Sequence, residues 1–349
     1  MPDFHKLAIS EVKKETPSSV SITLEIPENL QPSFTFKAGQ YITIKHTLEG
    51  KELRRAYSLC SSPTSGSLRV GIKKVENGSF SVYANTKLKV GDVLEVMQPE
   101  GAFVFEPQNN LSTTYGAFVA GSRITPVLSI IKDILEREPN SSFVLVYGNQ
   151  TLTECMFYSE LETLKSEYTD RLKIEYIYSR SKELNALQGR IDKSVVNYLL
   201  KNKYGKSDFS SFYLCGPETM IEEVSNTLKD RGIAKENIFF ELFTTSNEGE
   251  LEENHDGTTS VTITLDDETD TFVMDQKKSV LEAALKHGLD APFSCQGGIC
   301  STCIARITEG KVEMRKNQIL TDSELEEGLI LTCQAHPTTS KVVIDYDDV

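Results

Sequence analysis

The sequence predicts a multidomain protein: an antiparallel β-barrel, then an α/β domain with a parallel sheet, then a small α+β domain. Changes of pattern along the 349 residues support this division. Residues 1–107 contain short β-rich segments separated by Pro, Gly and Ser, as in barrels and sandwiches. Residues 108–243 alternate apolar, strand-like runs with helical patterns, which is typical of a parallel sheet covered by helices. Residues 244–258 are polar and acidic and indicate a flexible linker. Residues 259–349 form the last domain, beginning with a hairpin and a capped helix.

Composition limits the classes of partner. Residues 1–243 carry 30 acidic and 29 basic side chains, whereas residues 244–349 carry 21 and 8. The acidic C-terminal third argues against nucleic acid and anionic membranes and suits a basic protein surface, although acidic side chains also simply keep a protein in solution. The N-terminus lacks the apolar core of a signal peptide, and no apolar run reaches the roughly 20 residues of a membrane helix. We therefore expect a cytoplasmic protein that binds neither nucleic acid nor membrane.

Four of the seven cysteines lie in the last 55 residues. Cys295, Cys300 and Cys303 form a C-x4-C-x2-C motif, and Cys333 follows 30 residues later. This is the spacing of plant-type [2Fe–2S] clusters, in which four thiolates hold two irons. The alternatives are inert thiols and a structural zinc site, which usually has two C-x2-C pairs. The spacing favours the iron–sulfur cluster.

The cysteine motif and its surroundings resemble plant-type ferredoxin over residues 259–349. The matching segments are Val280–Gly288 (VLEAALKHG), Pro292–Cys295 (PFSC) and the later Cys333. The resemblance implies a β-grasp fold whose [2Fe–2S] ligands are Cys295, Cys300, Cys303 and Cys333.

Three short motifs follow one another in the first domain: Arg55–Ser58 (RAYS), Val70–Lys73 (VGIK) and Gly78–Ser81 (GSFS). In this order they resemble the flavin-binding domain of the ferredoxin–NADP+ reductase superfamily. Physical chemistry agrees, because a guanidinium and the free N–H groups of a helix N-terminus both bind phosphate. The alternative makes Tyr57 a core aromatic side chain and Arg55 a surface charge.

The superfamily resemblance implies a role for each flavin residue. It places Arg55 on the flavin pyrophosphate, Tyr57 against the isoalloxazine ring and Ser58 near N5. It implies FAD rather than FMN, because the pyrophosphate-binding elements are present. The residues implied to hold the phosphates, through backbone and hydroxyl groups, are Ile72, Lys73, Gly78, Ser79, Phe80 and Ser81.

Two further motifs lie in the second domain: Ala120–Pro126 (AGSRITP) after its first strand, and Cys215–Met220 (CGPETM) after its fourth. Both resemble the nicotinamide-binding domain of the same superfamily, and parallel sheets bind such ligands at their carboxyl ends. Cys215 would lie beside the nicotinamide and act with Ser58 in catalysis; the alternative is a buried strand cysteine. The other residues implied to contact the dinucleotide are Gly121, Ser122, Thr125, Pro126, Gly216 and Pro217, and Phe243 would shield the flavin.

Two further features, Arg123 and a group of three polar residues, bear on nucleotide binding. The superfamily usually has glycine where this chain has Arg123. If that position requires a positive φ, the arginine costs roughly 1–2 kcal/mol; its side chain would either crowd the dinucleotide or contact a phosphate. Ser179, Arg180 and Arg190 resemble a pocket for the adenosine 2′-phosphate, whereas an acidic residue would favour NADH. We expect NADPH in preference to NADH, with Arg180 as a plain solvated charge as the alternative.

The order of the three domains resembles reductase components of multicomponent oxygenases. It implies hydride transfer from the nicotinamide to FAD, then single-electron transfer through the [2Fe–2S] cluster to a protein acceptor such as an oxygenase component. Two alternatives remain open. One is an electron carrier with an impaired reductase half, which Arg123 would favour, and the other is a diaphorase-like reductase of small acceptors.

Overall fold

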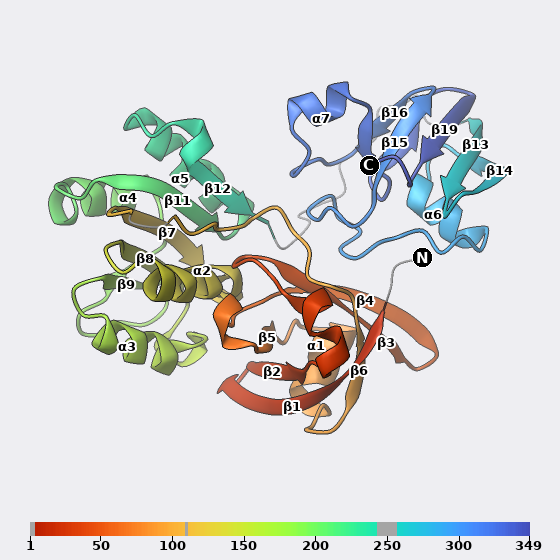
Figure 1. The fold of residues 1–349 in the computed structure, drawn as a ribbon. Coiled ribbons are helices and arrows are strands. Elements are labelled where there is room, and N and C mark those ends of the chain that lie inside the picture. The colour runs from red at the N-terminus through yellow and green to blue at the C-terminus, as the bar shows by residue number, and fades with distance from the viewer. Residues whose placement is uncertain (1–3, 109–110, 243–256) are drawn as a thin grey trace. The chain divides into compact units, whose positions relative to one another are not determined.

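The computed structural model describes residues 4–108, 111–242 and 257–349 (Figure 1). They form two compact units, the first comprising residues 5–53 and 57–242 and the second mainly residues 257–349. Phe243 and residues 244–256 of the expected linker lie outside the described residues. In the described ranges, no helix combines the length and apolar character needed to cross a membrane.

A six-stranded antiparallel sheet forms the N-terminal half of the first unit, in the spatial order β4-β3-β6-β1-β2-β5. A bridge between Leu59, directly after β4, and Val70 of β5 joins the two edges and closes the barrel. The core is filled by alternate side chains such as Ile22 and Ile72, both fully buried. The elements are β1 (His5–Thr16), β2 (Ser19–Glu25), η1 (Glu28–Phe34), β3 (Tyr41–Leu48), β4 (Lys51–Ser58), η2 (Pro63–Ser65), β5 (Leu68–Lys73), α1 (Ser79–Thr86) and β6 (Val93–Val96).

A six-stranded parallel sheet forms the other half, in the order β10-β9-β8-β7-β11-β12. The chain runs outward from β7 through β8 and β9 and then returns to the far side of β7 as β11. The winding therefore reverses between β7 and β11, and ligands of such sheets bind outside the carboxyl ends at this point. The strands are β7 (Thr114–Ala120), β8 (Ser142–Asn149), β9 (Leu172–Tyr178), β10 (Leu187–Gln188), β11 (Phe209–Cys215) and β12 (Ile238–Glu241).

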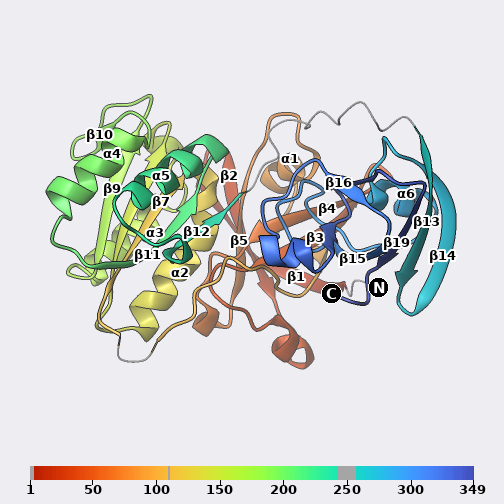
Figure 2. The same ribbon diagram turned by 90° about the horizontal axis from the view of Figure 1, so that it is seen from above.

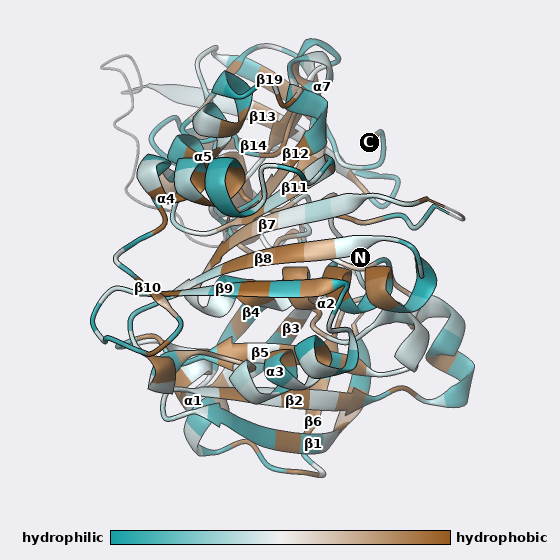
Figure 3. Cartoon of the chain, turned by 90° about the vertical axis from the view of Figure 1, so that its left-hand side faces the viewer, coloured by the Kyte–Doolittle hydropathy of each residue, from teal (hydrophilic) through white to brown (hydrophobic). Residues whose placement is uncertain are grey.

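Helices cover both faces of the parallel sheet, with α2 and α3 on the barrel side and α4 and α5 on the opposite side (Figure 3). Eleven of the fourteen residues of α2 are buried, including Ser129 and Asp133. The hydrophobic cluster that contains the buried side chains of α2 also includes residues of the barrel half, such as Cys60 and Phe103, and residues of the parallel sheet, such as Tyr147. The two halves thus share one core. The helical segments are η3 (Gly121–Arg123), α2 (Ile124–Arg137), η4 (Leu152–Glu154), α3 (Tyr158–Glu167), α4 (Lys193–Tyr198), η5 (Leu199–Lys203), α5 (Glu218–Asp230) and η6 (Lys235–Asn237).

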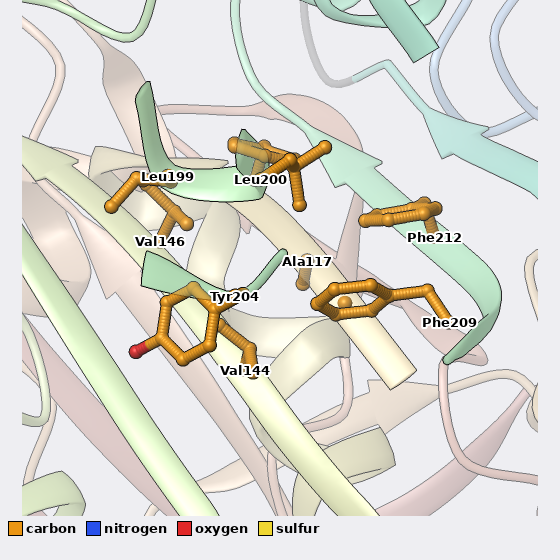
Figure 4. Close-up of a pocket in the computed structure, with 10 residues that line it drawn as sticks. Ala117, Val144, Val146, Leu199, Leu200, Tyr204, Phe209 and Phe212 are labelled. Carbon is orange, nitrogen blue, oxygen red and sulfur yellow. The ribbon is translucent and has the colours of Figure 1, made fainter. Parts of the chain in front are cut away.

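A small apolar hollow lies on the α4 side of the sheet, beneath the π-helical turn η5 (Figure 4). Its Tyr204 directs the hydroxyl to Glu175, 2.5 Å away. A dinucleotide site needs several convergent polar groups, so this hollow belongs to the packing of η5. The other side chains around it include Val144, Val146, Leu199, Leu200 and Phe212.

The second unit is a mixed five-stranded sheet in the order β14-β13-β19-β15-β17, with β13 parallel to β19 and antiparallel to β14 (Figure 2). Helix α6 is capped by Ser279, whose Oγ accepts from the N–H of Glu282, and Gly288 ends it at φ +87°. The expected hairpin and capped helix are therefore present, in a β-grasp arrangement. The elements are β13 (Thr258–Leu265), β14 (Glu268–Asp275), α6 (Val280–Lys286), β15 (Ile304–Glu309), β16 (Val312–Met314), α7 (Asp322–Glu326), β17 (Leu329–Leu331), β18 (Ala335–Pro337) and β19 (Lys341–Asp345).

Arg171, just before β9, holds the C-terminal end of α2. Its guanidinium donates to the carbonyl oxygens of Leu135 (3.0 Å), Glu138 (2.6 Å) and Ser141 (2.8 Å). The last carbonyls of a helix lack intrahelical partners, and a cation there also interacts favourably with the helix dipole.

We expect Arg171→Met to lower the free energy of unfolding by about 2 kcal/mol, because these carbonyls lose a charged donor. Thermal or urea unfolding followed by circular dichroism measures this. Lys173→Met is the matched control, since Lys173 is exposed and donates to one carbonyl, that of Thr169. Equal stability of the two variants would contradict the assignment.

Candidate functional site

Three helices next to the expected cofactor positions, α1, α2 and α5, begin without a side-chain cap. Helices α4, α6 and α7 are capped by the side chains of Asp192, Ser279 and Thr321. Helix α3 is uncapped as well and begins where the barrel half packs against it. First-turn N–H groups without a cap carry the positive end of the helix dipole and are available to phosphate. The uncapped ends of α1, α2 and α5 therefore suit phosphate-containing cofactors.

The structure brings the expected flavin residues together on β4, β5 and the start of α1. Tyr57 is half-buried, and its ring centroid lies 5.9 Å from that of Phe80. Arg55 is exposed, which leaves its guanidinium accessible to a phosphate. Asn85 of α1 donates to the carbonyl oxygen of Ile72 (3.1 Å) and so fixes α1 to β5, beside Lys73.

The turn before α1 requires glycine. A Cβ at Gly78 would lie 2.5 Å from Ser81 Oγ, which accepts a hydrogen bond from the N–H of Val75. Because Ser81 Oγ bonds outside the helix, the amides of Ser79 and Phe80 keep no side-chain partner within the first turn. This arrangement fits the pyrophosphate-binding role that the resemblance implies.

The nucleotide loop after β7 needs its positive φ at Gly121 (+60°), not at Arg123, whose φ is −72°. The strain considered for Arg123 is therefore absent. Tyr147 of β8 is fully buried, and its hydroxyl donates to the carbonyl of Gly121 (3.0 Å). Thr125 Oγ1 donates to the carbonyl of Ser122 (3.4 Å), which tightens the same turn before Pro126. Tyr147 was not identified from the sequence, because an apolar strand gives no signal that distinguishes it from core.

Ser58 and Cys215 meet at Glu241, the last residue of β12. Ser58 Oγ donates to the Glu241 carboxylate (3.3 Å), and Cys215 Sγ donates to the Glu241 carbonyl (3.5 Å). Both Ser58 and Cys215 are buried. Burial raises the pKa of the Cys215 thiol well above its usual value, so it stays protonated at neutral pH. Sequence reasoning gave Glu241 no role, although its place at the carboxyl end of a parallel strand was a signal.

Tight packing sets the distance between the flavin strand β5 and the nucleotide loop. A Cβ at Gly71 would lie 2.9 Å from both Phe157 Cζ and Thr125 Cγ2, and 3.1 Å from Met156 Cε. Only glycine allows so close an approach. Phe157 itself has φ +59°, a conformation rare for a bulky side chain.

The residues expected to bind the adenosine phosphate follow β9 and β10, at the carboxyl ends of these parallel strands. Gln188 of β10 pairs with Tyr178 of β9, so Ser179 and Arg180 after β9 lie beside Arg190 after β10. Arg180 and Arg190 are exposed. Nearby, Ser181 Oγ is buried and has no hydrogen-bond partner within the described chain. An orphaned hydroxyl beside two guanidinium groups fits a phosphate.

The second nucleotide motif, Gly216 and Pro217, joins β11 to α5. A Cβ at Gly216 would lie 2.1 Å from Met220 Cε, so the turn has no room for a side chain without moving that methionine. Pro217 precedes the uncapped first turn of α5. The motif thus places the N-terminus of α5, which has no side-chain cap, next to Cys215, at the point where the winding of the sheet reverses.

The four cysteines of the second unit form two pairs and no disulfide. Cys295 pairs with Cys300 and Cys303 pairs with Cys333; the thiol–thiol interaction within each pair lowers the pKa of Cys295 and Cys333 and raises that of Cys300 and Cys303. In the described ranges, no three His, Cys, Asp or Glu side chains converge on a single metal position. Two thiol pairs fit a [2Fe–2S] cluster better than one zinc ion, because each iron takes two thiolates.

The loop around the cysteines turns its backbone toward the sulfurs. The N–H of Gly297 donates to Cys295 Sγ (3.3 Å), and the amide of Gly298 bonds to Cys333. Gly298 has φ +69°, and a Cβ there would lie 2.6 Å from the carbonyl oxygen of Lys316. Amide–sulfur hydrogen bonds stabilise a negative cluster and help to set its potential.

We expect Cys303→Ala to abolish iron binding and the visible absorption of the cluster, because one iron loses a thiolate. Bound FAD should persist, since the expected flavin residues of β5 and α1, together with Tyr57 and Ser58, lie in the other unit. Iron and flavin content of the purified protein measure both. Cys60→Ala, at a buried cysteine of the barrel half, is the control and should retain two irons per chain. A Cys303→Ala protein that also retained two irons would contradict the ligand assignment.

Comparison with protein families matches three consecutive segments of the chain. They are an oxidoreductase FAD-binding domain at residues 6–105, an oxidoreductase NAD-binding domain at 118–226 and a 2Fe-2S iron-sulfur cluster binding domain at 263–338. These segments coincide with the barrel, the parallel sheet and the β-grasp sheet. The family descriptions agree with the FAD, nicotinamide and [2Fe–2S] cofactors expected from the sequence.

Curated relatives and solved structures match along nearly the whole chain. The chain is 38% identical to a subunit of the 1,2-phenylacetyl-CoA epoxidase of Escherichia coli (strain K12), over 99% of both proteins. It is 30% identical to the ferredoxin reductase component of 3-ketosteroid-9-alpha-monooxygenase of Rhodococcus rhodochrous, over 97% of this chain and 96% of that protein. The structure of phthalate dioxygenase reductase shares the fold at a TM-score of 0.63 and 23% identity, over 98% of each chain. The chain therefore belongs to the family of oxidoreductases that join FAD-binding, NAD-binding and [2Fe–2S] domains, together with that epoxidase protein.

Proposed function

We propose that the protein carries electrons from NADPH through FAD and the [2Fe–2S] cluster to the oxygenase component of a multicomponent oxygenase. The observation that carries this proposal is the meeting of Ser58 and Cys215 at Glu241, where the flavin strand faces the carboxyl edge of the nucleotide sheet. The similarity to an epoxidase protein over 99% of the chain makes an epoxidase acting on phenylacetyl-CoA the first acceptor to test. The absence of disulfides among the described cysteines supports a reducing compartment such as the cytoplasm.

The residues expected at the flavin and nicotinamide sites bind and align the two cofactors. When bound, FAD accepts a hydride and releases its electrons one at a time. The amides of α1 and the Arg55 guanidinium hold phosphate, and Tyr57 provides an aromatic surface for a ring. Ser58 holds a proton at Oγ and is itself oriented by Glu241. The Cys215 thiol is uncharged and packs at the expected nicotinamide position. The site therefore aligns its ligands rather than abstracting a proton.

We expect Ser58→Ala and Glu241→Gln each to slow flavin reduction roughly tenfold or more at saturating NADPH, because Glu241 accepts from Ser58 and orients its hydroxyl, and polar groups held in place at a reacting centre contribute on this scale. The Kd of NADPH should change less than twofold. Anaerobic rapid mixing over a range of NADPH concentrations separates the two quantities. Glu236→Gln, at an exposed position shortly before β12, serves as control. Wild-type rates in both site variants would remove Ser58 and Glu241 from the mechanism.

NADPH preference rests on Arg180 and Arg190 beside the buried Ser181 hydroxyl. We expect Arg180→Ala/Arg190→Ala to lower kcat/KM for NADPH at least tenfold and to leave kcat/KM for NADH nearly unchanged, because NADH lacks the 2′-phosphate. Lys182→Ala, an exposed neighbour, is the matched control. A wild-type kcat/KM no higher with NADPH than with NADH would refute the preference.

The acidic second unit supports docking onto a basic surface of the acceptor. The turn between β13 and β14 carries Asp266, Asp267 and Glu268, and the N–H groups of both aspartates bind the Asp347 carboxylate. Electrostatic association weakens as salt screens the charges. We expect electron transfer to the oxygenase component to slow as ionic strength rises, while reduction of a neutral dye stays constant. A diaphorase-like enzyme would show no such difference. The backbone of Arg123 is unstrained, which removes one of the two reasons to consider an impaired reductase half; crowding of the dinucleotide by the Arg123 side chain stays a prediction.

A further inference from the structure

The carboxylate of Glu160 links the barrel half of the first unit to the parallel-sheet half, where Lys73 of β5 also pairs with Glu154 of η4 (3.4 Å). Glu160 of α3 accepts from Arg69 of β5 (2.9 Å) and from Lys132 of α2 (2.6 Å). Arg69 also binds Glu15 of β1 (2.8 Å). The side-chain exposed fractions are 14% for Arg69, 12% for Lys132, 4% for Glu15 and 21% for Glu160. These two cations and two carboxylates form a largely buried network without net charge, and the half-exposed Lys13 lies 3.7 Å from Glu15 at its edge.

Glu160 stays ionised despite its burial. Burial acts to raise the pKa of Glu160, but the charges of Lys132 and Arg69 outweigh it and hold the pKa below its usual value. Both links therefore persist at neutral pH. They would be lost only as the pH falls through this lowered pKa. A carboxyl group whose pKa is depressed in the folded protein stabilises the fold while it is ionised and loses this contribution when it is protonated.

Other contacts cross the same junction. Lys132 Nζ donates to the carbonyl of Cys60 (2.7 Å), and Ser129 Oγ donates to the carbonyl of Ser61 (2.7 Å). The guanidinium of Arg69 lies over the ring of Phe157, 5.0 Å from its centroid. Helix α2 and the start of α3 are therefore attached to the segment that leads from β4 into β5.

The two elements that Glu160 connects both carry residues of the candidate site. Arg69 lies on β5 three positions before Ile72, where the flavin is expected, and Lys132 lies on α2 two turns after Thr125 of the nucleotide loop. The separation of β5 from α2 thus determines the separation of flavin from nicotinamide. Hydride transfer is sensitive to this distance, since a misplacement of about 1 Å can cost roughly a hundredfold in rate.

We propose that Glu160 is a positioning residue for hydride transfer, which sets the nicotinamide–flavin distance by binding Arg69 and Lys132 at once. The inference rests on the flavin and nucleotide sites assigned under the proposed function. A network with a purely structural role would stabilise the fold without affecting the alignment of the two ligands, and the two roles can be separated by charge.

The decisive variant is the neutral pair Glu160→Gln/Lys132→Gln. Glu160→Gln alone leaves an extra buried positive charge and destabilises the protein under either role. The double variant restores neutrality, keeps the Arg69–Glu15 pair within the barrel and removes the ionic link through Glu160, while the more exposed Lys73–Glu154 pair at the same junction stays in place. Lys193→Gln/Asp230→Asn is the matched control, because it removes an exposed ion pair between α4 and α5, away from the junction.

The FAD-loaded variants are mixed anaerobically with NADPH, unlabelled or deuterated at the transferred position. For the double variant we expect a melting temperature close to that of wild type, a Kd within twofold, a limiting rate of flavin reduction about tenfold lower and a larger isotope effect. The absorbance band from contact between nicotinamide and flavin should weaken. The control pair should match wild type in every readout.

A double variant with the wild-type limiting rate and isotope effect overturns the inference, as does a slow variant whose isotope effect and contact band are unchanged. These outcomes differ from failure of the proposed function. In that case the wild-type flavin itself is reduced by neither nucleotide, and the inference falls with it.

Discussion

The packing of β5 against α2 and α3 is the contact on which the first unit depends. Gly71 allows it, because any side chain there would meet Phe157 and Thr125 at 2.9 Å. The buried charges of Arg69 and Glu160 bridge it, and a single core runs through both halves. The barrel and the parallel sheet therefore fold as one body. The β-grasp unit has a core of its own, built from residues such as Val261 and Ile344.

This division matches the demands of the two kinds of electron transfer. Hydride transfer requires two rings held at van der Waals distance, and a shared core with a buried ion network suits this demand. Single-electron transfer to a partner requires accessible redox groups and complementary charge, which suits an acidic unit with its own cluster. The polypeptide supplies alignment, burial and charge, while the redox chemistry belongs to the cofactors.

Local sequence signals predicted much of this structure. The cysteine spacing indicated the four thiolates of a [2Fe–2S] cluster, Pro, Gly and Ser separated the predicted strands of the barrel, and a hairpin and a capped helix were expected at the start of the last domain. The features that the sequence did not predict are contacts between residues far apart in the chain. Arg69 and Glu160 are 91 residues apart in sequence, and Ser58 and Glu241 are 183 apart, so periodicity and spacing could not connect them.

The loop at Arg123 shows a different limit. The resemblance showed that the usual glycine is absent at position 123, but it did not show which residue of the loop has a positive φ. In the structure that residue is Gly121, two positions earlier. Motif boundaries do not reveal which residue of a loop carries the positive φ. The roles expected for Phe243 and for the linker remain predictions, because these residues lie outside the described ranges.

The central claim is that one chain conducts electrons in order from nucleotide to flavin to cluster. The most direct test mixes the fully loaded wild-type protein anaerobically with NADPH and follows flavin and cluster absorbance separately. We predict flavin bleaching at a rate that rises with NADPH concentration, followed by loss of cluster absorbance at a rate independent of it. A flavin that bleaches while the cluster stays oxidised, or a cluster reduced before the flavin, would contradict the account.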